Sequence, residues 1–164
     1  MKNFLFAVCF LTAYSGVAQK TGVESIKIPV PVQFAFDGMY PGTKGNIWII
    51  DKKDRYRTTF ELSPGKEVRI WITSSGEIPK LLEDIDKKEV PAIVRELSDK
   101  RITASMKVNK YSRLTTKKYG LFKVRTKVIY RQSLSNENHS WVNRYSEEGK
   151  FLGKEKRRNV RIAF

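Results

Sequence analysis

Apolar and polar residues along this chain follow a helical period in two places. Within residues 30–39, Val32, Phe36 and Met39 fall near helical spacing, and a proline stands in the first turn. Residues 89–97 repeat these features, with apolar residues at positions i, i+3, i+4 and i+7 of the segment. The pattern predicts one short helix in each half of the chain.

Segments in which apolar and polar residues alternate follow each predicted helix. Short polar turns containing glycine separate several of them, as expected for an antiparallel meander with one buried face and one exposed face. The predicted strands are 46–51, 55–62 and 67–73 in the first half, and 102–111, 119–132 and 140–145 in the second.

The order of one helix and three strands therefore occurs twice, within about residues 29–79 and 89–153. We predict an α+β fold in which tandem α-β-β-β units form one curved antiparallel sheet with the helices on one face. Residues 83–86 are interpreted as a solvated entry to the second helix. Residues 154–161 are interpreted as a mobile, basic C-terminal tail.

The N-terminus has the pattern of a cleavable secretory signal. Lys2 precedes a short apolar run and a small-residue ending, so residues 1–18 are predicted to be removed, leaving one domain over 19–164. The run is too short to span a bilayer, and Cys9 follows too few apolar residues for a lipoprotein signal. We expect a periplasmic or secreted protein without a transmembrane anchor and without a disulfide, because Cys9 is the only cysteine.

The net charge of the chain is +15, and loss of Lys2 with the signal leaves it at +14. A charge of this size attracts polyanions. Export makes nucleic acid an unexpected partner, and an acidic protein or an anionic envelope polymer is predicted instead. The alternative is that the charge serves solubility alone.

Four segments carry a family resemblance: AFDGMYPGTKGNIWI (35–49), RYRTTFEL (55–62), EVRIWITSSGEI (67–78) and IDKKEVPAIVREL (85–97). Over roughly residues 29–153 the chain resembles the periplasmic PepSY-like family, also called beta-lactamase-inhibitor-like, often found in Bacteroidetes. The resemblance implies tandem α-β-β-β units and a role in binding rather than turnover. The aromatic-Pro-Gly turn at 40–42 has no counterpart in the second half, and this chain is far more basic than is common in that family.

Catalytic and metal-binding patterns are absent from the sequence. The sole histidine, His139, stands in a polar segment with no nucleophile pattern to serve it, so no catalytic residue is predicted. Residues 83–86 lack the spacing of a calcium loop, and residues 41–45 lack the following helix that a phosphate-binding loop needs. No cofactor or metal is predicted. Two alternatives stay open: an envelope glycan-active enzyme with two carboxylates in one cleft, and a purely structural envelope component.

The strand predicted at 119–132 has a cation at almost every second position. Alternation places Phe122 and its partners towards the helices and the cations on the opposite, open face of the sheet. Trp71 on the same face is either an exposed anchor or a ring packed against an arginine stem. We therefore predict a non-catalytic binding module, inhibitor-like in its sharper form. Its predicted binding residues are Arg55, Arg57, Arg69, Trp71, Lys123, Arg125, Lys127 and Arg131.

Overall fold

The computed structural model describes residues 26–43, 47–52 and 54–157. The predicted signal peptide, residues 1–18, lies outside the described residues. The elements, in chain order, are helix α1 (Val30–Met39), strands β1 (Ile47–Lys52), β2 (Arg55–Ser63), β3 (Lys66–Thr73) and β4 (Lys80–Ile85), the 3-10 turn η1 (Lys87–Glu89), helix α2 (Ala92–Asp99), and strands β5 (Lys107–Tyr119), β6 (Val124–Ser135), β7 (Ser140–Ser146) and β8 (Phe151–Arg157).

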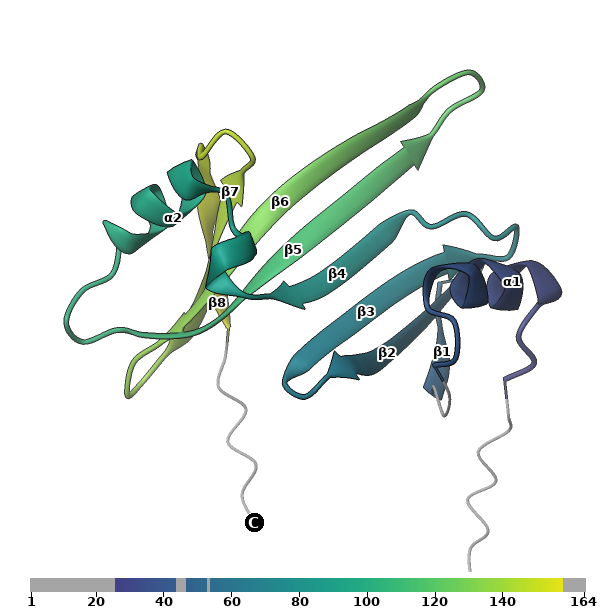
Figure 1. The fold of residues 1–164 in the computed structure, drawn as a ribbon, viewed down its shortest axis with the longest axis horizontal. Coiled ribbons are helices and arrows are strands. Elements are labelled where there is room, and N and C mark those ends of the chain that lie inside the picture. The colour runs from purple at the N-terminus through teal and green to yellow at the C-terminus, as the bar shows by residue number, and fades with distance from the viewer. Residues whose placement is uncertain (1–25, 44–46, 53, 158–164) are drawn as a thin grey trace, which may run out of the picture.

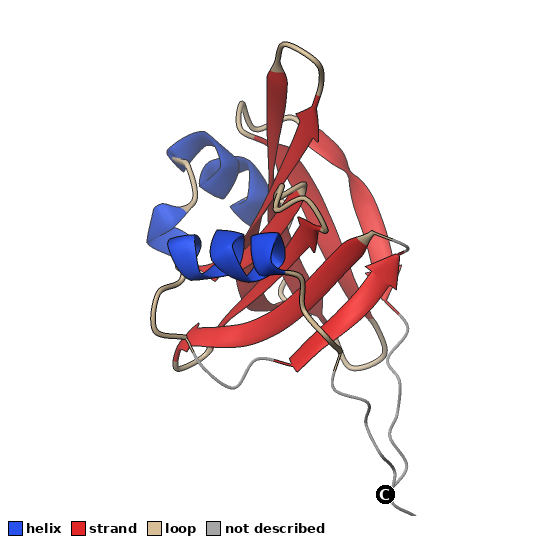
Figure 2. Cartoon of the chain, turned by 90° about the vertical axis from the view of Figure 1, so that its right-hand side faces the viewer, coloured by secondary structure: helices blue, strands red, loops and turns tan. Residues whose placement is uncertain are grey.

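All eight strands form a single open antiparallel sheet, and their order in space is their order in the sequence (Figure 1). Short turns favour this arrangement within each half, because two strands joined by a tight turn pair with each other. β4 and β5 are also neighbours, although η1 and α2 lie between them in the sequence. Both helices lie on the same side of the sheet (Figure 2). The predicted α+β class, the antiparallel sheet and the placement of the helices on one face are confirmed.

Two hydrophobic clusters hold the helices on the sheet. In the first, Phe36 of α1 is fully buried, and its ring lies edge-on to Trp48 and Phe60 at centroid distances of 5.3 and 5.4 Å. Edge-to-face aromatic pairs at this spacing are favourable. In the second, Val94 of α2 packs in a cluster that includes the buried Tyr145 of β7. The apolar residues of the alternating strands therefore lie on the side of the sheet that faces the helices.

Two turn glycines lie directly beneath the helices. Gly76 follows β3 with φ of +88°, and a Cβ there would lie 2.9 Å from the backbone oxygen of Pro31 in α1. Gly149 follows β7 with φ of +85°, and a Cβ there would lie 2.8 Å from Leu97 in α2. Glycine is required at both turns because it adopts positive φ without strain and leaves room for the helix.

The prediction of three strands after each helix is wrong, because four strands follow each one. Residues 83–85 belong to β4 rather than to a solvated helix entry. The adjacent residues Leu81 and Leu82 break the alternation of apolar and polar residues that predicts a strand, so β4 was missed. Part of the predicted basic tail, up to Arg157, is β8, and the remainder of that tail lies outside the described residues.

The strand predicted at 119–132 is interrupted by a turn that the sequence analysis missed. β5 runs to Tyr119 and β6 begins at Val124, so the two strands form one long hairpin. The backbone N–H of Gly120 donates to the oxygen of Lys123 at 3.1 Å and closes the turn. Phe122, which we expected to face the helices, is 95% exposed at the end of this hairpin.

Candidate functional site

The side of the sheet that faces away from the helices is called here the outer face. Strand pairing aligns six of its residues in a row that crosses β1 to β6. Because side chains of paired residues project to the same side, these six are neighbours in space. This central row consists of Ile49, Arg57, Trp71, Lys80, Thr116 and Lys127.

Trp71 lies in the middle of the central row and is only 5% exposed. The Nζ atom of Lys80 lies 4.2 Å from the centroid of its ring, and the Cζ atom of Arg57 lies 5.9 Å away. A cation at this distance over a tryptophan ring is attracted by the ring quadrupole. Of the two interpretations of Trp71, the packed ring is correct and the exposed anchor is wrong.

Lys80 was not among the predicted residues, because β4 was not recognised as a strand. Burial lowers the pKa of its ammonium group, and the positive charges of Arg55 and Arg131 lower it further. Strand register places cations of β2, β4 and β6 in the central row, namely Arg57, Lys80 and Lys127. Lys80 thus lies between the predicted cations of β2 and β3 and those of β6.

A short apolar strip runs beside the central row. Leu82 of β4 pairs with Leu114 of β5, and Leu114 pairs with Ile129 of β6. All three side chains are half-buried although no helix covers them. A protein interface commonly has such an apolar centre surrounded by polar and charged groups.

Three of the predicted cations have carboxylate partners within the protein. Arg55 forms a hydrogen-bonded ion pair with Asp51, and the hydrogen bond lowers the pKa of the aspartate. Arg69 pairs with Glu67 at 3.0 Å. A guanidinium nitrogen of Arg131 lies 3.8 Å from Glu155 of β8. Part of the positive charge on the outer face is therefore neutralised internally.

Several other cations on the outer face form no ion pair among the described residues. By strand register they include Arg57, Lys80, Lys118, Arg125, Lys127 and Arg144. The field of the outer face stays positive because these cations are not neutralised by ion pairs.

Seven of the eight predicted binding residues lie on the outer face, in two groups. Arg55, Arg57, Arg69 and Trp71 are on β2 and β3, whereas Arg125, Lys127 and Arg131 are on β6. With β4 and β5 between them, β3 and β6 are about 14 Å apart. The eighth residue, Lys123, lies outside the face, in the turn between β5 and β6.

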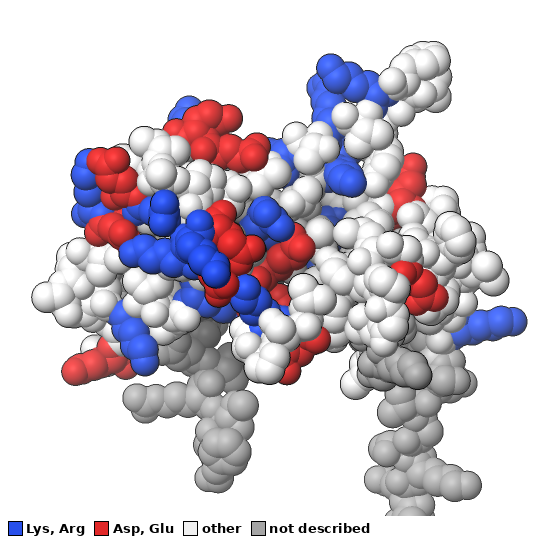
Figure 3. All heavy atoms as spheres, in the orientation of Figure 1, with Lys and Arg blue, Asp and Glu red and all other residues white. Residues whose placement is uncertain are grey.

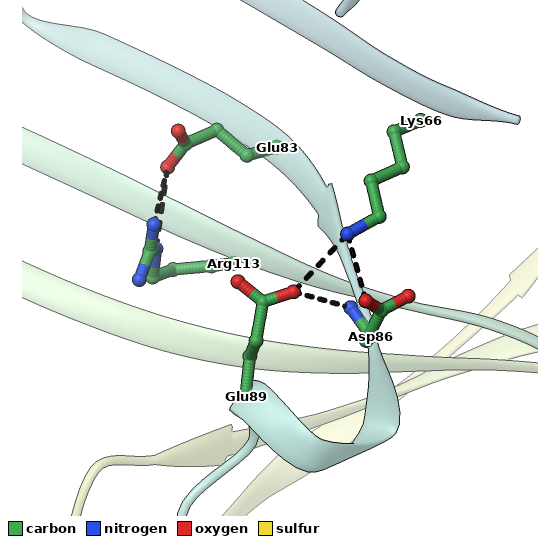
Figure 4. A network of polar contacts seen from close by, with 5 residues as sticks. All are labelled: Lys66, Glu83, Asp86, Glu89 and Arg113. Atoms are coloured by element: carbon green, nitrogen blue, oxygen red, sulfur yellow. Dashed lines mark hydrogen bonds and ion pairs between the residues drawn. The ribbon is translucent and has the colours of Figure 1, made fainter. Parts of the chain in front are cut away.

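The helix side of the sheet carries a different arrangement of charge, in which cations and acids are interspersed (Figure 3). Lys66 of β3 lies 2.8 Å from Asp86 and 3.4 Å from Glu89, and Arg113 of β5 lies 3.1 Å from Glu83 (Figure 4). The side chain of Glu89 also accepts a hydrogen bond from the backbone N–H of Asp86 at 2.8 Å. These contacts connect β3, β4, η1 and β5 across the middle of the molecule.

This network bears on the alternative of an enzyme with paired carboxylates. Hydrogen bonds from Lys66 and from the backbone lower the pKa values of Asp86 and Glu89, respectively. A general acid for glycoside cleavage needs a carboxyl group with a raised pKa. The lowered pKa values of Asp86 and Glu89 favour the ionised form, which is the wrong state for that role.

Two other features bear on function: clusters of metal ligands and membrane-spanning helices. Within the described ranges, no group of three or more His, Cys, Asp or Glu side chains is placed to hold a metal ion. His139 is exposed in the turn between β6 and β7. Among the described residues, no helix is long and apolar enough to cross a bilayer.

No protein-family model matches this chain, and no curated protein matches it. Solved structures with a similar fold do exist. A protein of Bacteroides eggerthii described as periplasmic is 21% identical, with a TM-score of 0.66, over 83% of this chain and 94% of that one. A DUF2874 family protein of Bacteroides ovatus is 18% identical, with a TM-score of 0.63, over 84% of this chain and 94% of that one.

A BLIP-like protein of Bacteroides fragilis is 14% identical, with a TM-score of 0.58, over 82% of this chain and 89% of that one. At these identities the likeness is one of fold. The resemblance to a periplasmic, beta-lactamase-inhibitor-like family that the sequence indicated is confirmed at that level.

Proposed function

We propose that this protein is a periplasmic, non-catalytic binding module that holds an acidic protein on the outer face of its sheet. The observation that carries the proposal is the composition of that face. It presents a half-buried apolar strip beside several cations that form no ion pair among the described residues, while both helices cover the opposite side.

An acidic protein fits this face better than an anionic envelope polymer, the other partner class that the charge allows. A polymer would need only the cations. The strip of Leu82, Leu114 and Ile129 adds an apolar centre that a partner protein buries. The cations around it attract and orient acidic surfaces during encounter.

A periplasmic location is supported by two independent observations. The N-terminal residues 1–18 have the pattern of a secretory signal. A solved protein with the same fold, from Bacteroides eggerthii, is described as periplasmic. We place this chain in the same compartment, where acidic proteins of the envelope are available as partners.

We also infer that the two halves are copies of one unit. In the turn after β3, Gly76 N–H donates to the oxygen of Thr73 at 2.9 Å, and in the turn after β7, Gly149 N–H donates to the oxygen of Ser146 at 3.1 Å. Each glycine then approaches the helix of its own half. Matching turns in matching places support a duplication, with four strands in each copy.

The binding proposal is tested by capture from a periplasmic extract with the predicted mature chain, eluted by a salt gradient. A variant carrying Arg57→Gln, Lys80→Gln and Lys127→Gln removes three unpaired charges from the outer face. A matched control carrying Lys27→Gln, Lys88→Gln and Lys150→Gln removes the same charge from exposed positions outside that face.

We expect the captured acidic protein to elute at moderate salt, because exposed charges are screened beyond about 8 Å at physiological ionic strength. The outer-face variant should release it at lower salt than the control does. Equal elution of the two variants would refute the use of this face.

The sharper form of the proposal is inhibition of an extracytoplasmic hydrolase. The BLIP-like protein of Bacteroides fragilis shares this fold, which makes beta-lactamases the first enzymes to assay. We expect the wild-type protein to lower the hydrolysis rate, and the outer-face variant to do so less. Unchanged rates with beta-lactamases and with secreted peptidases of the host would remove this form while leaving the capture experiment to decide the broader proposal.

A further inference from the structure

The end of the β5–β6 hairpin exposes more apolar side chain than its role in the fold requires. Leu121 and Phe122 are 90% and 95% exposed, and the adjoining Tyr119 and Val124 are 38% and 51% exposed. These residues belong to what is called here the hairpin tip, residues 119–124. Figure 1 shows the hairpin projecting beyond the rest of the sheet at the upper right. The two apolar side chains at the apex therefore face solvent on a protruding element.

The hairpin tip has a defined structure. The strands remain paired up to Tyr119 and Val124, and the turn is closed by the 3.1 Å bond from Gly120 N–H to Lys123. The hydroxyl of Tyr119 accepts from the backbone N–H of Ile78 at 3.0 Å and lies 3.2 Å from the oxygen of the same residue. These bonds tie the base of the tip to the loop before β4. Leu121 and Phe122 are thus held outward by a fixed turn.

Cations without any acid surround the hairpin tip. Residues 117–127 contain five Lys or Arg and no Asp or Glu. None of these five cations takes part in an ion pair among the described residues, and Lys118 stands directly opposite Arg125 in the strand register. Like charges in that position repel, so the arrangement is relieved by an anion from outside. In Figure 3 the projecting end of the hairpin shows blue and white spheres.

The dimensions of this end match those of a bilayer interface. Lys118 lies three residues before Leu121 and Arg125 three residues after Phe122, which places both roughly 7–10 Å behind the apex at about 3.3 Å per residue. Apolar groups of interfacial proteins enter the headgroup and acyl boundary to about 5–10 Å. Insertion of the apex to that depth brings the cations level with lipid phosphates.

A planar anionic surface also explains why charge is present on both sides of the hairpin. Successive residues of a strand point to opposite faces, so Lys117 and Lys118 project to different sides. A cleft of an acidic protein would contact a limited part of this ring of charge. A layer of phosphates meets all of it at once, and long Lys and Arg stems can follow the surface.

We propose that the hairpin tip docks on an anionic phospholipid bilayer, with Leu121 and Phe122 inserted at the interface and Lys118, Lys123 and Arg125 held against lipid phosphates. This membrane contact shares Lys118 and Arg125 with the outer face but centres on the hairpin tip, and it goes beyond the proposed protein binding. It would hold the module at a membrane surface with the β2 and β3 residues of the outer face free.

The experiment measures sedimentation of the predicted mature chain with vesicles of phosphatidylcholine alone or mixed with phosphatidylglycerol. We expect binding to the anionic vesicles and little to the neutral ones. Lys118→Gln, Lys123→Gln and Arg125→Gln together should weaken binding on the order of 100-fold, from about fivefold per cation. Leu121→Ser with Phe122→Ser should weaken it at least tenfold.

Depth of insertion is measured with a single fluorescent label. Because Cys9 is the only cysteine and lies in the predicted signal, Leu121→Cys gives the mature chain one thiol for an environment-sensitive dye. Glu137→Cys, in the turn at the other end of β6, is the matched control. We expect a blue shift on anionic vesicles at position 121 and none at 137.

Several results would overturn the proposal: no binding to anionic vesicles, equal binding by the Leu121→Ser/Phe122→Ser variant, or an unshifted dye at position 121. Loss of acidic-protein capture by the tip variants in the absence of lipid, with vesicles inert, would also overturn it and assign the tip to a protein partner. The tip side chains are exposed, so unfolding curves of these variants should match that of the wild type and serve as the folding control.

Discussion

Replacement of Trp71 by alanine tests whether the centre of the outer face is a structural element. Trp71 is 5% exposed on a face that no helix covers, and its ring lies 4.2 Å from the Nζ atom of Lys80. If the ring is covered by neighbouring side chains of the sheet, its loss removes packing that holds β2, β3 and β4 together. We expect Trp71→Ala to lower the free energy of unfolding strongly.

The expected size follows from the burial of the side chain. A buried tryptophan removes about 150–250 Å² from water, and at about 25 cal/mol per Å² this corresponds to about 4–6 kcal/mol. Structure that persists in the denatured chain makes this an upper value. Tryptophan-to-alanine changes in well-packed sites lose about 3–5 kcal/mol, and we expect a loss in that range.

Urea denaturation followed by far-ultraviolet circular dichroism measures the effect. Trp71→Phe is the matched control, because it keeps an aromatic ring in the same place and should lose much less stability. Lys80→Met removes the charge while keeping an apolar stem. A double-mutant cycle between positions 71 and 80 should give a coupling free energy of about 0.5–2 kcal/mol.

Two results would refute the reasoning. A loss below about 1 kcal/mol for Trp71→Ala would mean that the ring contributes little packing, because exposed substitutions usually fall in that range. Unchanged stability combined with loss of partner binding would mean that Trp71 acts as a binding anchor despite its burial.

Two further predictions concern the charged network and the turns. The pKa values of Asp86 and Glu89 are lowered in the folded protein, so their contribution to stability is present above about pH 4 and is lost as the pH falls below it. Lys66→Met should therefore lower stability at neutral pH and make stability fall less steeply in acid. Thermal unfolding across a range of pH measures both effects. A pH profile identical to that of the wild type would contradict this. Gly65→Ala and Gly76→Ala both place alanine at positive φ, which costs about 1–2 kcal/mol. Only at position 76 would the new Cβ also lie against a backbone oxygen. Gly76→Ala should therefore lose clearly more stability than Gly65→Ala in urea denaturation. Equal losses would show that the approach of α1 to this turn is not tight.

Much of the fold could be predicted because the local patterns are strong. Helix α1 was predicted at its observed bounds, and β2 and β3 within about a residue of theirs. Alternation in β3 correctly separated Val68, Ile70 and Ile72, which are buried under α1, from Arg69 and Trp71 on the other side. In the candidate site, alternation alone was enough to place seven of the eight residues on one face.

Other features could not be predicted because their signals are weak or not local. β4 is six residues long and has two adjacent leucines, so its contributions to the site, Lys80 and Leu82, were missed. The turn at Gly120 was included in a predicted strand, although the adjacent apolar residues Leu121 and Phe122 break the alternation there, and the exposure of Phe122 was missed as a consequence.

The sequence by itself determined which cations leave the core, because the direction of a side chain in a strand depends only on its place in the alternation. It also determined the charge that those cations add to an open face. The tertiary structure alone decided that Lys80 lies over Trp71 and that Leu82, Leu114 and Ile129 form one strip. These contacts join different strands, and the pairing of β4 with β5 spans the segment that contains η1 and α2, so their register is set by the packing of the sheet.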